Sequence, residues 1–256
     1  MRRIVERIAE GLTAAISAWD TVECVILCEQ AEEDVLDPYF ALVVDVYHRG
    51  PVPAPETRRA AFGDPGAFES ASVQPKDRFF LEGLPIRVEY KSVAKIEEIL
   101  TRGADILWLL KDTGTYVFYR LERGHILWQR SEWLREVRAQ LLSLDVVIWE
   151  GLRESFQNKM EHYLADLGAA TMMGDDFFLL VSSAGFARYA AATIFMINRR
   201  FEPSHRSIES HLRKLSIIPD DFFGRWEMLL RTDGAFSPEQ KHKVAELIAK
   251  SIVSFS

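Results

Sequence analysis

The change in hydrophobic periodicity near residue 103 constrains the fold of this 256-residue chain more than any other feature. Before it, short runs of β-branched and aromatic residues alternate with helical patterns. After it, long helical periodicities follow one another and strand-like runs nearly disappear. We therefore predict an α+β fold, in which a small mixed sheet with flanking helices over residues 1–102 precedes an all-helical bundle over residues 103–256.

Local patterns predict the individual elements. In the first part we expect helices over 3–19, 55–63 and from 93 onwards, and strands over 22–27, 39–47 and 84–90. In the second part we expect helices over 104–111, 115–122, 131–166, 175–200, 204–215, 219–231 and 237–254. Residues 39–47 are apolar almost throughout, as is typical of a strand buried on both faces, so this strand is predicted to be central. Ser92 and Ser237 are predicted to start helices.

Two of the predicted strands carry one carboxylate each within an apolar run, Asp45 in the second strand and Glu89 in the third. Ionised carboxylates are rare inside such strands, and one that faces a site usually binds a cation or moves a proton. If these strands are neighbours, Asp45 and Glu89, assisted by Glu29 from the acidic segment after the first strand, suit Mg²⁺. Such a metal would neutralise charge on a transferring phosphoryl group, so we predict Asp45 and Glu89 as catalytic and all three acids as metal ligands.

The same two carboxylates have a structural alternative. Arg87 shares a predicted strand face with Glu89, and Lys91 lies just beyond it. Ion pairs with these cations at the rim of a sheet would also explain acids within strands. The sequence leaves both interpretations open.

Four residues are candidates for holding phosphate. His48 ends the second strand and Lys91 ends the third, while Arg199 and Arg200 begin the densest basic region of the chain. In the functional interpretation these side chains face the acids and bind the phosphates of a nucleotide. In the alternative they belong to solvated loops and helix surfaces.

A resemblance to a known superfamily rests on short segments. Residues 37–40 (Asp-Pro-Tyr-Phe), 42–47 and 67–70 resemble the nucleotidyltransferase superfamily, in particular an uncharacterised bacterial branch of it. Residues 192–201 resemble the helical C-terminal domain of kanamycin-type nucleotidyltransferases. The resemblance implies Mg²⁺-dependent transfer of a nucleotidyl group from a nucleoside triphosphate to a hydroxyl of a small molecule or protein.

Two departures from the superfamily pattern keep other functions open. The superfamily typically has Gly-Ser at the start of a helix after the first strand, where it holds phosphates, but residues 28–31 read Cys-Glu-Gln-Ala. It also has two acids spaced Asp-x-Asp, whereas this chain has Asp45 alone. The alternative is a catalytically inactive ligand-binding or interaction protein on the same fold. A further alternative is a nuclease, because Asp45 with Glu89-Tyr90-Lys91 resembles the Asp…Glu-x-Lys arrangement of a nuclease superfamily.

Composition bounds the partners and the compartment. A net charge of −7 argues against affinity for nucleic acid or an anionic membrane. No apolar run is expected to reach bilayer-spanning length, and the N-terminus lacks a signal-peptide pattern. Cys24 and Cys28 lie too far apart on one strand to be bridged, so we expect buried free thiols and a cytoplasmic protein. Exposed aromatic side chains on the helices could form a homodimer interface.

Overall fold

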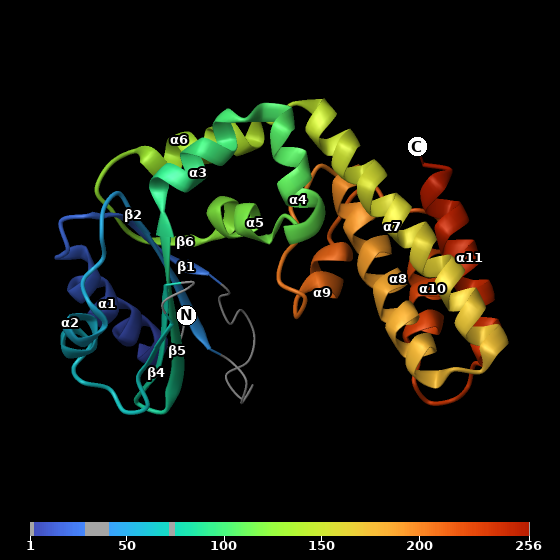
Figure 1. Cartoon of the computed structure of the whole chain (residues 1–256), viewed down its shortest axis with the longest axis horizontal. Helices are drawn as coiled ribbons and strands as arrows, with labels where there is room; N and C mark the ends of the chain where they lie inside the picture. Colours follow the sequence, from blue (N-terminus) through green and yellow to red (C-terminus); the bar gives the residue numbers. More distant parts are fainter. Residues whose placement is uncertain (1–2, 29–40, 72–74, 256) are drawn as a thin grey trace. The chain divides into compact units, whose positions relative to one another are not determined.

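The computed structural model describes residues 3–28, 41–71 and 75–255. The chain forms two compact units. Figure 1 colours the chain by position in the sequence, from blue at the N-terminus to red at the C-terminus. The first comprises Met1–Gly103 and Val117–Ser143, and the second comprises Ala104–Tyr116 and Leu144–Ser256. This division differs from the single boundary expected at residue 103, because residues 117–143 contribute a strand to the sheet and belong to the first unit.

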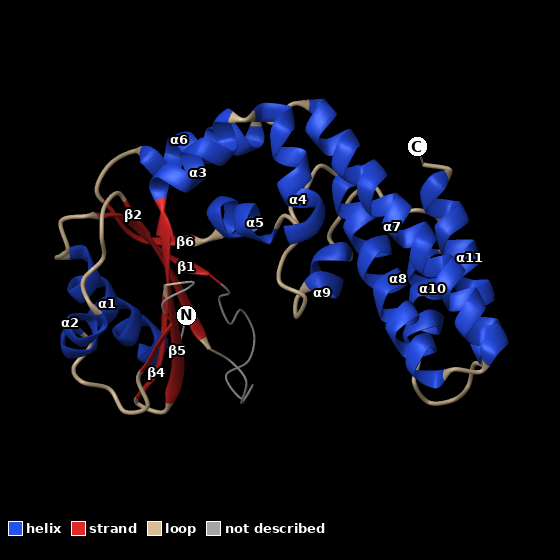
Figure 2. Ribbon diagram, viewed as in Figure 1, coloured by secondary structure: helices blue, strands red, loops and turns tan. Residues whose placement is uncertain are grey.

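A six-stranded mixed sheet forms the centre of the first unit (Figure 2). Its strands are β1 Val22–Cys28, β2 Leu42–His48, β3 Glu69–Ala71, β4 Lys76–Leu81, β5 Leu84–Ser92 and β6 His125–Gln129. Their order is β3-β4-β5-β2-β1-β6, with β2 parallel to β5 and every other neighbouring pair antiparallel. The three predicted strands are confirmed as β1, β2 and β5, and β2 is an interior strand, as its apolar run predicts.

Helices of the first unit flank this sheet on both faces. They are α1 Arg3–Ser17, α2 Pro55–Ala61, α3 Val93–Thr101, α5 Tyr116–Arg123 and α6 Trp133–Leu142. The apolar side of α1, including Ile8, Leu12 and Ile16, belongs to one buried cluster with Val44 of β2 and Val88 of β5. We call this the core face of the sheet, and the opposite one the polar face. Ser92 caps α3 by accepting a hydrogen bond from the Lys95 N–H, as predicted.

Three strands were not predicted. The segment before β5 was expected to be a polar connection, but it contains β3 and β4. In β4 the two buried positions are Asp77 and Phe79. Because one of them is an acid, the sequence of β4 does not show the alternation of apolar and polar residues that predicts a strand. The edge strand β6 is half-buried along Ile126, Leu127 and Trp128, so it shows no alternation either.

All regular elements among the described residues of the second unit are helical. The unit begins within the 3₁₀ turn η1 Gly103–Ile106 and contains the helices α4 Leu107–Thr113, α7 Val146–Met173, α8 Asp176–Ile197, α9 Ile208–Leu212, α10 Phe222–Leu230 and α11 Pro238–Val253. The longest helices, α7 and α8, pack side by side and are joined at Gly174, whose φ of 65° ends α7. The predicted single helix over 131–166 is wrong, because α6 ends at Leu142 and Asp145 caps a new helix. Ser237 forms the predicted N-terminal cap of α11.

Among the described residues, one helix has the length and composition of a membrane span, which the sequence was not expected to contain. It is α8, and 44% of its most apolar window is buried inside the protein. The C-terminal part of α8, from Ala190 to Met196, is buried in the second unit. A core helix of a bundle passes the same test of length and composition, so α8 alone is weak support for a membrane span.

Candidate functional site

Strand alternation places the predicted acids on the polar face of the sheet. Along β5, Ile86, Val88 and Tyr90 contribute to the buried core, so Arg87, Glu89 and Lys91 point the other way. The parallel pairing of β2 with β5 sets Asp45 beside Glu89 and Tyr47 beside Lys91. The sequence prediction that the two acid-bearing strands are neighbours is thus confirmed.

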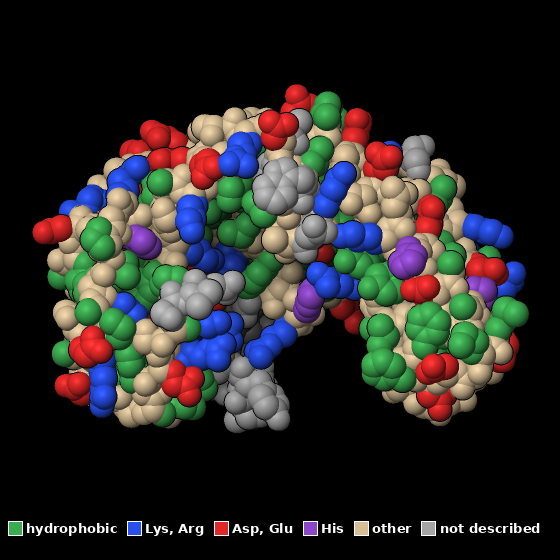
Figure 3. All heavy atoms as spheres, viewed as in Figure 1, with side chains coloured by type: hydrophobic (Ala, Val, Ile, Leu, Met, Phe, Trp, Pro, Cys, Tyr) green, Lys and Arg blue, Asp and Glu red, His purple; other side chains and the backbone are tan. Residues whose placement is uncertain are grey.

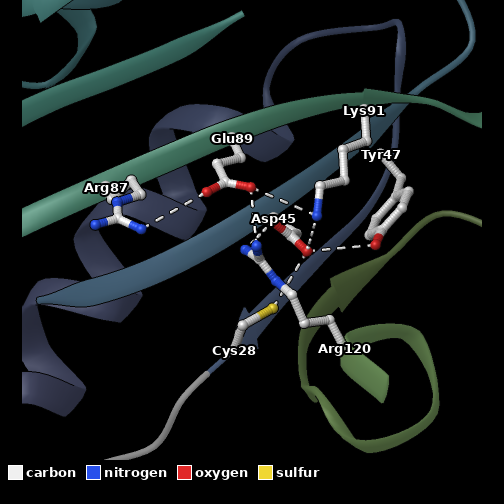
Figure 4. Close-up of polar contacts among 7 residues, drawn as sticks. All are labelled: Cys28, Asp45, Tyr47, Arg87, Glu89, Lys91 and Arg120. Atoms are coloured by element: carbon white, nitrogen blue, oxygen red, sulfur yellow. Dashed lines mark hydrogen bonds and ion pairs between the residues drawn. The ribbon is translucent and has the colours of Figure 1, made fainter. Parts of the chain in front are cut away.

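Asp45 is fully buried and is held by two cations (Figure 4). Lys91 Nζ donates a hydrogen bond to Asp45 Oδ2 at 2.7 Å, and Arg120 Nη2 of α5 donates to Asp45 Oδ1. Arg120 also donates from Nη1 to Glu89 Oε2 at 2.9 Å, and Lys91 Nζ lies 3.6 Å from the same oxygen. Two carboxylates and two cations therefore form a charge-balanced group, which we call the charge cluster: Asp45, Glu89, Lys91 and Arg120.

Two neutral donors complete the surroundings of Asp45. The Cys28 thiol and the Tyr47 hydroxyl each donate to Asp45 Oδ2 at 3.3 Å. Burial, and then the charge of Asp45, raise the pKa of Cys28 and the pKa of Tyr47. Both groups therefore keep their protons and act as donors to the carboxylate. Cys24 and Cys28 are buried free thiols, as the sequence predicts.

The charge cluster stabilises the ionised forms of Glu89 and Arg120. Burial by itself raises the pKa of Glu89, but Arg120, Lys91 and then Arg87 outweigh it, and the pKa lies below its ordinary value. Burial likewise opposes the charge of Arg120, but Asp45 and Glu89 raise its pKa above the ordinary value. Both carboxylates thus have protein cations as counter-ions.

These residues do not fit the predicted magnesium ion. Mg²⁺ takes carboxylate oxygens that have no competing cation, whereas both oxygens of Asp45 already accept hydrogen bonds from Arg120 and Lys91. A divalent ion there would lie beside two fixed positive charges. Within the described residues, no group of three or more His, Cys, Asp or Glu side chains has the geometry of a metal site. Glu29, the third predicted ligand, lies outside the described residues.

The predicted phosphate ligands are placed in different surroundings. Lys91 belongs to the charge cluster. The ring of His48 bonds locally, with Nδ1 2.5 Å from the carbonyl oxygen of Gly50. Arg199 and Arg200 follow the end of α8 and belong to the second unit.

Arg120 is the residue of this site that sequence reasoning missed. It lies on α5, in a segment expected to join the helical bundle, and its side chain is 6% exposed. Phe118 and Leu121, its neighbours on α5, are fully buried. A single arginine among the buried positions of an otherwise apolar helix face is the signal that predicts a carboxylate partner.

A row of cations continues from the charge cluster toward the edge of the polar face. The antiparallel register sets Arg78 directly opposite Arg87, and Lys76 opposite Glu89. Like charges directly across two strands destabilise a sheet. Arg87 Nη1 lies 4.0 Å from Glu89 Oε1, and Glu69 of β3 lies opposite Arg78 on its other side. We call Lys76, Arg78 and Arg87 the basic row. Figure 3 shows Lys and Arg side chains gathered beside the position of β4 and β5.

A second polar network lies on the core face and is fully bonded. Arg58 of α2 donates from Nε and Nη2 to the two oxygens of Asp77, at 2.7 and 2.8 Å. Tyr90 donates to Asp77 at 2.7 Å, and Arg58 also reaches Ser70 Oγ and the Pro53 carbonyl oxygen. Arg58 and Asp77 are buried and their hydrogen-bonding groups are satisfied within the protein. The network therefore fastens α2 to β3, β4 and β5.

Comparison with known proteins adds a similarity of fold. No protein-family model and no curated protein matches this sequence. Among solved structures, the chain is similar to a nucleotidyltransferase-like protein from Exiguobacterium sibiricum 255-15, with a TM-score of 0.49 and 15% sequence identity. The match covers 97% of this chain and 74% of that protein. At this level the similarity assigns neither an activity nor a residue role to this chain.

Proposed function

We propose that this chain binds a phosphate-bearing ligand on the polar face of its sheet and does so without a metal held by Asp45 and Glu89. The observation that carries the proposal is the charge cluster, in which Arg120 and Lys91 occupy the carboxylates. Nucleotidyl transfer assisted by Mg²⁺ would need these acids free for the metal. Of the functions considered from the sequence, the geometry therefore favours the catalytically inactive ligand-binding protein.

The charge of the polar face supports an anionic ligand. Its described strands and α5 place five cations there, Lys76, Arg78, Arg87, Lys91 and Arg120, against the three carboxylates Asp45, Glu69 and Glu89. This local excess of positive charge occurs in a chain whose net charge is −7. The members of the basic row are at least partly exposed. A phosphate would relieve the repulsion between Arg78 and Arg87, and arginine offers paired N–H donors for its oxygens.

The sequence resemblance supports a nucleoside triphosphate as the first ligand to test. Its three linked phosphates carry the multiple negative charges that a row of cations binds most strongly. Phe80 lies on the same face of β4 as Arg78 and is 53% exposed. Its ring is therefore available to stack against a base.

Replacing both Arg78 and Arg87 by alanine is expected to weaken ATP binding at least about tenfold, because a hydrogen bond to a charged group contributes about 1.5–3 kcal/mol. Isothermal titration of the full chain with ATP measures this directly. The matched control is Arg7→Ala with Arg59→Ala, which removes the same charge from exposed arginines outside the polar-face strands. That variant should bind as the wild type does, apart from a small long-range effect.

Two results would contradict the proposal. Equal weakening by both double variants would mean that the basic row has no specific role. Absence of binding to ATP, GTP, CTP and UTP alike would remove the nucleotide ligand and leave the interaction-protein alternative.

A further inference from the structure

The N-terminal half of α8 leaves an apolar stripe uncovered in the second unit. Phe177, Leu180 and Val181 are 77%, 68% and 44% exposed, and Ala184 is exposed beside them. We call these four residues the α8 stripe. They recur at helical spacing, so they form one side of the helix. Figure 3 shows hydrophobic side chains gathered on the lower part of the second unit.

The two ends of the α8 stripe carry opposite charges. Asp175 caps the helix and Asp176 begins it, and both are exposed. Arg188 is exposed one turn beyond Ala184, at the other end of the stripe. A helix face that is acidic at one end and basic at the other is complementary to itself when the partner helix runs in the opposite direction.

We propose that the α8 stripe is the surface on which two copies of this chain associate, with their α8 helices antiparallel about a two-fold axis. An axis near residue 182 places Asp176 and Arg188 six residues to either side, about 9 Å along the helix at about 1.5 Å per residue. Arg188 of each copy then meets Asp176 of the other. Leu180 of one copy lies against Ala184 of the other, a large side chain against a small one, and the symmetry makes each contact occur twice.

The neighbouring apolar surface extends the same interface. Met172 and Met173, at the end of α7, are 90% and 71% exposed beside the start of the stripe. Unbranched methionine side chains adapt readily to a partner surface. Two carboxylates at this tip and a net charge of −7 oppose an anionic bilayer, so a second copy fits the α8 stripe better than a membrane does.

Sedimentation velocity of the full chain over a wide range of concentration tests the proposal. The wild type should show a monomer–dimer equilibrium, and Leu180→Asp should weaken it at least about tenfold, since an apolar anchor at the centre of an interface is replaced by a charge. Lys250→Glu, at an exposed position near the end of α11, makes a charge reversal away from the stripe and should leave the equilibrium unchanged.

A charge exchange distinguishes the antiparallel arrangement from any other dimer. Arg188→Glu and Asp176→Lys should each weaken self-association, because each pairs like charges twice. Mixing the two variants should restore dimers, because both contacts then join opposite charges. Circular dichroism of each variant verifies that the helices remain folded. Leu180→Asp, which disrupts the apolar contact and not the ion pairs, tests the same interface independently.

Three outcomes would overturn the proposal. They are a chain that stays monomeric at all concentrations, a dimer that neither Leu180→Asp nor Arg188→Glu weakens, and variants that do not recover association on mixing. Co-sedimentation of the wild type with phosphatidylserine vesicles, lost in Leu180→Asp, would assign the stripe to a membrane instead.

Discussion

Replacing Asp45 by asparagine is expected to lower the free energy of unfolding by about 3–5 kcal/mol in metal-free buffer, because breaking a buried ion pair leaves its partner charge uncompensated. Asp45 is fully buried, and Arg120 beside it is 6% exposed. The amide would also turn an N–H group toward Arg120 or Lys91 in place of an acceptor. Urea unfolding followed by circular dichroism measures the loss.

This prediction separates the two interpretations of the acids. If Asp45 and Glu89 formed a metal site, two nearby carboxylates would repel each other in metal-free buffer, and neutralising one would leave stability unchanged or raise it. Asp20→Asn, at an exposed position of the same unit, is the matched control and should change stability by less than about 0.5 kcal/mol. An Asp45→Asn protein as stable as this control would contradict the structural role of the charge cluster.

Replacing Asp77 by alanine is expected to cost a similar amount, about 3–5 kcal/mol, because it leaves the Arg58 guanidinium buried without its carboxylate. The loss should also affect α2, since Arg58 is the residue that fastens this seven-residue helix to β3 and β4. The same urea unfolding experiment measures it, with Asp20→Ala as the exposed control.

A double-mutant cycle shows whether the Arg58–Asp77 contact itself is responsible. Arg58→Met and Asp77→Ala together should cost less than the sum of the two single losses, with a coupling of about 0.5–3 kcal/mol. Strict additivity would mean that the two side chains act independently and that the network does not fasten α2.

The parts of the fold that the sequence predicts are those in which one residue type repeats with the period of the element. The apolar side of α1 and the continuous run of β2 are of this kind, and so is the cap of α11 at Ser237. By contrast, β4 hides its period because Asp77 occupies a core position, where Arg58 of α2 neutralises it. Local periodicity carries no information about a partner that is 19 residues away in the chain.

The same limit applies to the candidate site. Two acids within strands are visible in the sequence, and their adjacency follows once β2 and β5 pair. Arg120 reaches Asp45 across 75 residues from a helix that sequence reasoning assigned to the bundle. Whether a buried acid binds a metal or a protein cation depends on such distant residues, so the sequence supports both interpretations and the three-dimensional contacts favour one.

Isothermal titration of the wild-type chain with ATP, in EDTA and then in excess Mg²⁺, tests the central claim most directly. Binding to the basic row requires no metal, and Mg²⁺ neutralises part of the phosphate charge, so we predict binding in EDTA that is at least as tight as binding in Mg²⁺. Binding that occurs only with Mg²⁺ and is abolished by Asp45→Asn in a variant that stays folded would contradict the claim. That result would instead identify Asp45 as a metal ligand.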